Sequence, residues 1–112
     1  MRILYKILPA AEWRMAQSRG VFEGSAVDLT DGFIHLSTST QMRETAARHF
    51  AGQDELMLVG FREEDLPNLK CEPSRGGDLF PHVHGVIATA LAVSEAALPL
   101  ENGVHRFPGG AA

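Results

Sequence analysis

The 112-residue chain has little cysteine, no excess of basic residues and no long apolar run. Its single cysteine, Cys71, excludes an intrachain disulfide and a cysteine-based zinc site. No stretch approaches the roughly 20 apolar residues that a membrane-spanning helix needs. The formal net charge of −4 argues against a surface that wraps nucleic acid. We therefore expect a cytoplasmic protein with a small-molecule partner and neither a membrane nor a nucleic-acid partner.

What the chain does contain is typical of one globular domain. Apolar residues make up 45% and charged residues 21%, a balance that excludes a disordered chain. A chain of this length can bury a single hydrophobic core. We predict one domain over residues 1–104, followed by a flexible tail rich in glycine and proline at 105–112.

Apolar periodicity divides the chain into strands and helices in an irregular order. The predicted strands are 2–8, 33–36, 55–61, 69–72 and 85–93. The segment 55–61 is apolar on both faces, which favours a central position in its sheet. A helix is predicted at 9–19, with Pro9 in its first turn, Trp13 facing inward and Gly20 as its stop. This irregular order predicts an α+β fold with a mostly antiparallel or split sheet.

Two further segments carry the spacing of a capping box. Ser25 and Asp28 have this spacing at a turn or one short helical turn. Thr38 and Gln41 fit the pattern T-x-x-Q, which predicts a helix that runs on to about residue 50.

The stretch "DGFIHLSTSTQ", residues 31–41, is the first candidate site. His35 lies on a predicted strand, and Ser37, Thr38 and Ser39 follow at a helix start. The free N–H groups of such a helix start suit a phosphate or a carboxylate. Two interpretations stay open: His35 lines a ligand cleft beside these hydroxyls, or it is a core histidine bonded to a backbone carbonyl, with plain N-capping after it.

The second candidate stretch, residues 71–85, combines a carboxylate, a guanidinium, an imidazole, two glycines and an aromatic ring: Glu72, Arg75, His82, Gly76, Gly77 and Phe80. The charged groups are typical of a polar small-molecule site. Paired glycines let a backbone approach a ligand closely or turn tightly. The alternative is a solvated loop with a weak ion pair.

A histidine metal site is a further alternative. His82 and His84 would share one face of a strand, and His35 could be a third zinc ligand for metal-assisted hydrolysis. Pro81 argues against regular strand pairing at this point. We therefore expect no metal.

Other chemically active side chains are expected to have ordinary structural roles. Cys71 is predicted to be a small buried hydrophobe and not a nucleophile. His49, on the outer side of its helix, and His105, in the tail, are predicted to be solvated.

Several of these segments together resemble a known family. They are "ILYKI", Trp13, "DGFIHLST" followed by Gln41, "CEPSRGGDLFPH" and Gly85. Over about residues 3–93 the chain resembles the domain of unknown function 952 family of uncharacterised bacterial and plant proteins. Members of that family look like relatives of the ADP-ribosyltransferase fold. The resemblance therefore implies two small split β-sheets, helices at their edges and an NAD-binding cleft between them.

The resemblance also implies roles for individual residues. His35 would hydrogen-bond the ribose on the nicotinamide side, with Ser37 or Thr38 close by. The chain has no clear counterpart of the aromatic stacking motif of the better-known transferases or of their catalytic glutamate motif. Glu72 is the candidate replacement for that glutamate. Relatives that transfer an RNA 2′-phosphate onto NAD use histidine and arginine instead, a pairing that is similar in residue type to His35, Arg75 and His82.

The leading hypothesis is a small domain that binds NAD, ADP-ribose or a related phosphorylated ribose ligand. If it is an enzyme, we expect an ADP-ribosyltransferase-like glycosyl or phosphoryl transfer at ribose. His35 would orient the ribose, Arg75 would hold a phosphate and Glu72 would stabilise the oxocarbenium-like charge, with His82 beside them. A non-catalytic module that senses a nucleotide or metabolite is the main alternative, and a histidine metal hydrolase is the third.

Overall fold

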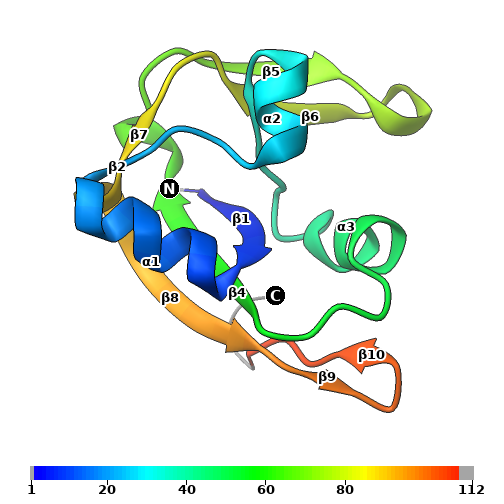
Figure 1. Cartoon of the computed structure of the whole chain (residues 1–112). Coiled ribbons are helices and arrows are strands. Elements are labelled where there is room, and N and C mark those ends of the chain that lie inside the picture. Colours follow the sequence, from blue (N-terminus) through cyan, green and yellow to red (C-terminus); the bar gives the residue numbers. More distant parts are fainter. Residues whose placement is uncertain (1, 109–112) are drawn as a thin grey trace.

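The computed structural model describes residues 2–108, which form an α+β domain with two separate three-stranded antiparallel sheets (Figure 1). The first sheet has the order β1-β4-β8, with β1 at Ile3–Pro9, β4 at Leu56–Arg62 and β8 at Ala92–Leu98. The second has the order β3-β6-β5, with β3 at Ile34–His35, β6 at Leu79–Val83 and β5 at Leu69–Pro73. The predicted α+β class is confirmed.

Shorter elements complete the domain. Two strand pairs join β2 (Val21–Phe22) to β7 (Ile87–Ala88) and β9 (Leu100–Glu101) to β10 (Val104–His105). The α-helices are α1 (Ala10–Arg19), α2 (Ala26–Asp31) and α3 (Met42–His49). Three 3₁₀ turns are η1 (Glu63–Asp65), η2 (Arg75–Gly77) and η3 (Thr89–Leu91). None of the helices in the described residues is long and apolar enough to cross a membrane.

Strand β4 lies at the centre of the first sheet, as its two apolar faces predicted. Val59 and Phe61 point into the larger core cluster, which includes Trp13 of α1. Leu58 points into the smaller cluster on the other face, which includes Met42 of α3. Each face of this sheet therefore has its own helix and its own part of the core.

Helix α1 begins and ends where the sequence predicted. Pro9 is its N-cap, and Gly20 closes it with a φ of +81°, a left-handed conformation that favours glycine. The Trp13 ring meets Phe22 and Phe61 edge-on, at centroid distances of 6.2 Å and 6.1 Å. Such edge-to-face pairs add to the stabilisation from buried area.

Helix α3 begins later than predicted, at Met42, after a turn that includes Thr38. Gln41 Oε1 accepts a hydrogen bond from the Thr38 N–H at 3.0 Å, the glutamine half of a capping box. Gln41 Nε2 donates to the Leu79 carbonyl at 2.8 Å and so connects this turn to the second sheet. The side chain is used for tertiary contact as well as for capping.

Three local predictions are wrong. The predicted strand 85–93 is divided by η3 into β7 and the start of β8. Cys71 is exposed, because its position in β5 faces away from the core. Pro81 pairs regularly in β6, opposite Cys71, so it does not interrupt the strand.

The C-terminal segment also differs from expectation. His105 is buried in β10, and its Nε2 donates to the Gln53 carbonyl at 2.7 Å. The expected boundary at residue 104 therefore falls inside a strand pair.

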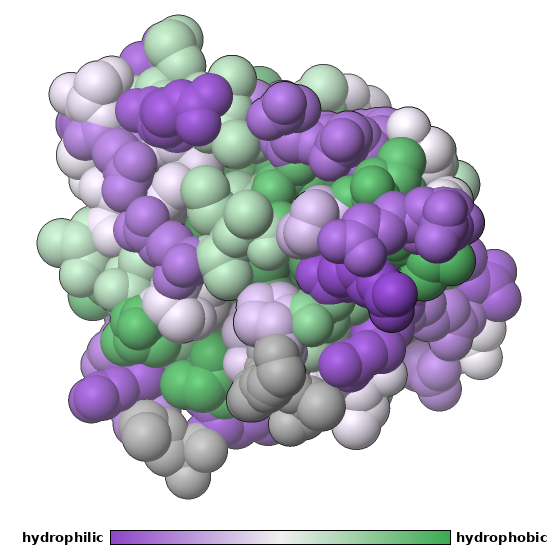
Figure 2. Space-filling view, turned by 90° about the horizontal axis from the view of Figure 1, so that it is seen from below, coloured by the Kyte–Doolittle hydropathy of each residue, from purple (hydrophilic) through white to green (hydrophobic). Residues whose placement is uncertain are grey.

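Seen from below (Figure 2), the surface shows hydrophobic areas between hydrophilic ones, which is normal because much of a folded protein's surface stays apolar.

Candidate functional site

A cavity of about 640 Å³ lies at the junction of the two sheets. Residues of β1, α2, β3, α3 and β6 line it, including His35, Ser37 and Phe80. The two sheets meet at this point because Tyr5 and Ser37 exchange two backbone hydrogen bonds of 2.8 Å. The chain leaves the second sheet after His35 and touches the first at Ser37, and the cavity occupies this split.

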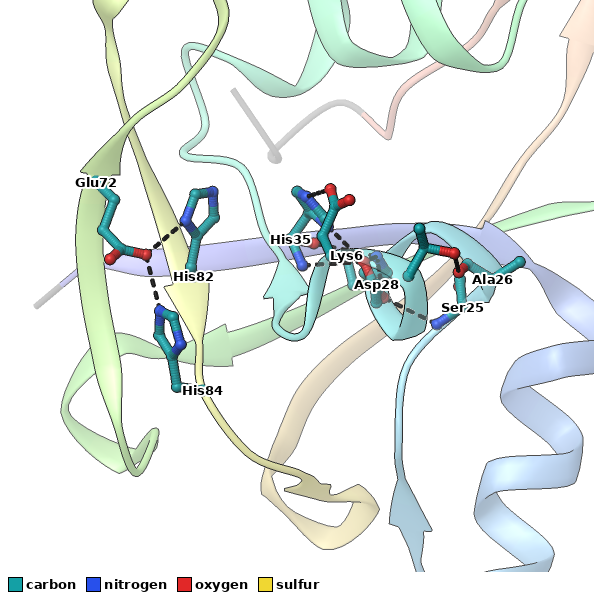
Figure 3. A network of polar contacts seen from close by, with 10 residues as sticks. Lys6, Ser25, Ala26, Asp28, His35, Glu72, His82 and His84 are labelled. Carbon is teal, nitrogen blue, oxygen red and sulfur yellow. Dashed lines mark hydrogen bonds and ion pairs between the residues drawn. The ribbon is translucent and has the colours of Figure 1, made fainter.

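A buried ion pair supports one side of the cavity (Figure 3). Lys6 of β1 and Asp28 of α2 lie 2.8 Å apart, and both side chains are almost fully buried. Asp28 also accepts from the Ser25 N–H at 2.8 Å and from the His35 N–H at 3.1 Å. Lys6 donates in addition to the His35 carbonyl at 3.1 Å. A buried carboxylate with this many donors is fixed in position.

The same carboxylate orients the His35 ring. Asp28 Oδ1 lies 2.6 Å from His35 Nδ1, and Asp31 Oδ2 lies 3.0 Å from His35 Nε2. A ring can donate to both carboxylates only as the imidazolium ion. Asp28 is buried whereas Asp31 is exposed, so the Nδ1 contact is the fixed one and the Nε2 contact can be exchanged. This arrangement presents Nε2 as the reactive or ligand-binding atom.

The charges of this network follow from burial and pairing. Burial alone would raise the pKa of Asp28, but hydrogen bonding from His35 and the attraction and hydrogen bond of Lys6 lower it from 3.8 to about 2. Burial lowers the pKa of the Lys6 amine, and this effect is larger than the opposing attraction of Asp28. Asp28 is therefore ionised at neutral pH.

A second polar cluster lies on the second sheet. Glu72 Oε1 is 2.9 Å from His82 Nδ1 and 2.8 Å from His84 Nε2 (Figure 3). Hydrogen bonds from His84 and then His82 lower the pKa of the Glu72 carboxyl. The Phe33 ring stacks on His82 at a centroid distance of 4.2 Å and also contacts His35 at 4.7 Å. Phe33 therefore lies between the two histidines.

The structure does not gather the predicted site residues into one cleft. His35, Ser37 and Phe80 line the cavity. Among the described residues, six others lie outside its wall: Glu72, His82, Thr38, Ser39, Gly76 and Gly77. The Arg75 side chain lies outside the described atoms. The predicted residues therefore lie in two neighbouring groups, with the rings of His35 and His82 5.3 Å apart.

The interpretation of His35 as a core histidine bonded to a backbone carbonyl is wrong, because its ring nitrogens face two carboxylates. His49 is exposed, as predicted. Ser37 is buried, and its hydroxyl lies 3.0 Å from that of Thr45. It connects the cavity wall to α3.

Sequence reasoning missed Lys6 and Asp28 as site residues. The sequence pattern assigns Asp28 only a capping role beside Ser25 and gives Lys6 no role. One signal was present: in a strand at 2–8, Lys6 shares a face with Leu4 and Leu8, which are fully buried. A lysine between two core positions requires a buried anion, and a nearby aspartate is a natural candidate.

These features define the chain as a small α+β domain with a split pair of sheets and a ligand-sized cavity between them. The family model described as "Protein of unknown function (DUF952)" matches residues 7–96, and the chain belongs to that family. The family resemblance drawn from the sequence is confirmed. No match is found among curated proteins.

The chain is also similar to a solved protein, CC0527 from Caulobacter crescentus. Its crystal structure is 49% identical, with a TM-score of 0.89 over 93% of each chain. The solution NMR structure of CC0527 is 50% identical in its aligned part, with a TM-score of 0.84 over 93% of this chain and 91% of that one. A crystal structure of a CC0527 double mutant gives 47% identity and a TM-score of 0.89, again over 93% of each chain.

Proposed function

We propose that the cavity between the two sheets binds a small phosphorylated ribose ligand such as NAD, ADP-ribose or a related nucleotide. The observation that carries this proposal is the cavity itself, with His35 fixed at its wall by Asp28. Its volume of about 640 Å³ is within the range of small-molecule sites. The family resemblance implies an ADP-ribosyltransferase-like fold, and a fold of that kind would place its ligand between split sheets, which supports the proposal.

The chemistry of the cavity wall suits a nucleoside. Three aromatic side chains offer apolar surface for a flat base: Tyr5, Phe50 and Phe80. Hydroxyl and amide groups offer hydrogen bonds to ribose: Ser25, Ser37, Thr45, Ser74 and Gln53. The mixture of apolar surface with a few polar groups is typical of cofactor sites.

His35 is the proposed polar anchor for the ribose. Its Nδ1 is held by Asp28, and a ribose hydroxyl would take the place of Asp31 at Nε2. Asp31 is exposed and can turn into solvent without leaving a buried charge. Glu72 does not take part in this proposed cavity site, because its carboxylate is hydrogen-bonded to two histidines on the second sheet.

The pairing of Asp28 with His35 also favours catalysis over mere sensing. A buried carboxylate that fixes one ring nitrogen leaves the other nitrogen available as a general base or acid. In a transfer from NAD, the acceptor hydroxyl would replace the ribose hydroxyl at Nε2, give its proton to neutral His35 and form a bond from its oxygen to the anomeric carbon of the ribose. The nicotinamide would leave with the electron pair of the glycosidic bond. A non-catalytic sensing module would bind the same ligand without this step.

Thermal-shift and calorimetric titrations with NAD, ADP-ribose and nucleotide phosphates test the binding. At a ligand concentration ten times Kd, mass action adds about 1.4 kcal/mol, which raises Tm by about 5 °C in a domain of this size. His35→Gln should reduce the shift, whereas Arg48→Ala, on the exposed face of α3, should leave it unchanged. No shift with any of these ligands would overturn the proposal.

Release of nicotinamide separates enzyme from sensor. The full chain is incubated with NAD, and the products are identified by mass spectrometry. Release that is lost in His35→Gln indicates catalysis through this residue. Binding without release indicates the sensing module.

A further inference from the structure

We infer that Glu72, His82 and His84 form a binding site for a divalent transition-metal ion, best suited to Zn²⁺. Two imidazoles and one carboxylate are a donor set that zinc uses in proteins with water as the fourth ligand. The three side chains contribute ligand atoms that all lie within 4.8 Å of one another. This site is separate from the cavity and does not depend on the proposed nucleotide ligand.

Strand geometry explains why the three groups converge. His82 lies in β6 and His84 follows directly after its last residue, Val83, and the two side chains project from the same face of the chain. In the antiparallel pair of β5 with β6, Lys70 is opposite His82 and Glu72 is opposite Phe80. Paired residues share a face, so Glu72 also lies on the face of the two histidines. The fold therefore directs all three side chains to one side of the second sheet.

The distances are close to those of a metal site. Glu72 Oε1 lies 2.9 Å from His82 Nδ1 and 2.8 Å from His84 Nε2. In a tetrahedral zinc site, ligands at the usual bond lengths lie about 3.3 Å from one another. The two Glu72–histidine distances would lengthen by about half an ångström to admit an ion, and the two imidazole nitrogens, which lie within 4.8 Å of each other, would settle at a similar separation. Each imidazole would then move the proton that it shares with Glu72 to its other ring nitrogen.

The cluster has one rigid ligand and two accessible ones. His82 is 3% exposed and stacked on Phe33, so its ring position is fixed. His84 and Glu72 have exposed side-chain fractions of 33% and 37%. Solvent can therefore reach the ligand atoms, which gives the ion an approach path and leaves room for bound water.

The environment of His82 indicates an exchangeable ion and not a structural one. Its Nε2 is buried and has no hydrogen-bond partner among the described residues. Metal-binding histidines usually donate their second N–H to a carboxylate or carbonyl, and loss of that partner weakens binding about 10- to 100-fold. Neither core cluster includes any of the three ligands, so the ion would lie apart from the packing that holds the domain together.

The third ligand differs from the one that the sequence suggested. His35 was the candidate, but both of its ring nitrogens face carboxylates, Asp28 and Asp31. Glu72 occupies the place beside His82 and His84 instead. The regular pairing of Pro81 in β6 also removes the main objection that the sequence raised against a metal.

Isothermal titration of the full chain with zinc chloride, without a histidine tag, tests this site. We expect one Zn²⁺ per chain, and Co²⁺ as a substitute should show the visible absorption of a low-coordinate ion. Glu72→Gln and His84→Gln should each weaken binding at least tenfold. Both residues are partly exposed, so these variants should fold, which circular dichroism checks.

Two matched variants define the ligand set. His49→Gln removes an exposed histidine on α3, and His35→Gln removes the neighbouring ring of the cavity. Both should bind Zn²⁺ as the wild type does. The inference is overturned if the wild type binds no Zn²⁺, if Glu72→Gln binds as tightly as the wild type, or if His35→Gln loses as much affinity as Glu72→Gln.

Discussion

Replacement of Asp28 by asparagine is the sharpest perturbation of the buried network. The Asp28→Asn side chain has nearly the same shape, but it has no charge to pair with Lys6 at 2.8 Å. It also keeps only one acceptor oxygen, so its NH2 group would face the Ser25 N–H and the Lys6 amine at the place where Asp28 Oδ2 accepts from both. The change therefore tests whether the charge of Asp28, and not its volume, holds the cavity wall together.

The size of the effect can be estimated from the pKa of Asp28. Folding lowers this pKa from 3.8 to about 2, and at about 1.4 kcal/mol per pH unit the shift corresponds to about 2.5 kcal/mol. Loss of the carboxylate also leaves the Lys6 charge buried without an opposite charge. Breaking a buried ion pair in this way costs about 3–5 kcal/mol. We expect Asp28→Asn to lower the free energy of unfolding by about 3–5 kcal/mol at pH 7.

The dependence on pH has a definite sign. A carboxyl group whose pKa is lowered by folding stabilises the protein above its unfolded pKa, and this contribution is lost as pH falls through the folded pKa. For Asp28 the window runs from 3.8 down to about 2. The wild type should lose stability steeply in this window. The difference between wild type and Asp28→Asn should therefore narrow as the pH approaches 2.

Urea unfolding at a series of pH values measures both effects. The fluorescence of Trp13, the only tryptophan, reports unfolding because its ring is buried in the core. Asp31→Asn is the matched control: it removes an exposed carboxylate from the same histidine and should cost less than about 1 kcal/mol. The reasoning is refuted if Asp28→Asn also costs less than about 1 kcal/mol at pH 7, or if its stability falls between pH 4 and 2 as steeply as that of the wild type.

A second substitution tests the cause of the loss. Lys6→Met in the Asp28→Asn background removes the unpaired buried charge and keeps the aliphatic stem. Apolar replacement of a whole buried pair is often neutral, so the double variant should regain at least about 1–2 kcal/mol. A double variant that is less stable than Asp28→Asn alone would show that the lysine is not the source of the destabilisation.

Three further substitutions test the packing by urea unfolding. Gly60→Ala should cost about 1–3 kcal/mol, because the new methyl group clashes with the Ser94 hydroxyl and also lies 3.0 Å from Ile3 Cγ2. An unchanged urea midpoint would contradict this close packing. His105→Ala should cost about 1–2 kcal/mol through loss of its buried bond to a backbone carbonyl, and no loss would place the last strand outside the cooperative unit. Arg48→Ala should change stability by less than about 0.5 kcal/mol, since its pair with Glu44 is exposed, and a larger loss would be inconsistent with that exposure.

Local signals in the sequence were enough for the first sheet and its first helix. Strand β4 is apolar on both faces, which only a central strand satisfies. Helix α1 has Pro9 and Gly20 at its ends, and both residues act through their own backbone conformation. The break of 85–93 by η3 was not predictable in this way, because its apolar residues fit a strand as well as a turn.

The candidate site depends on contacts that no local pattern reveals. Lys6 and Asp28 are 22 residues apart, and their partnership arises only when the fold brings Asp28 of α2 to the Lys6 side chain of β1. Glu72 and His84 were both visible as polar residues, but their convergence depends on the register of β5 with β6. The sequence therefore identified the polar residues that could form a site. It did not show which of them line the cavity and which form the separate cluster, because that depends on how the strands pair.

The Phe33 ring connects the two groups. It contacts His35 at a centroid distance of 4.7 Å, His82 at 4.2 Å and His84 at 5.1 Å. A rearrangement of the histidines around an ion must therefore press on the ring that also supports His35. We expect Zn²⁺ to change the affinity of the cavity for its ligand, and by linkage the ligand must change the affinity for Zn²⁺ by the same factor. Phe33→Leu, which removes the shared ring, should reduce this coupling, and equal coupling in the two proteins would rule out transmission through Phe33.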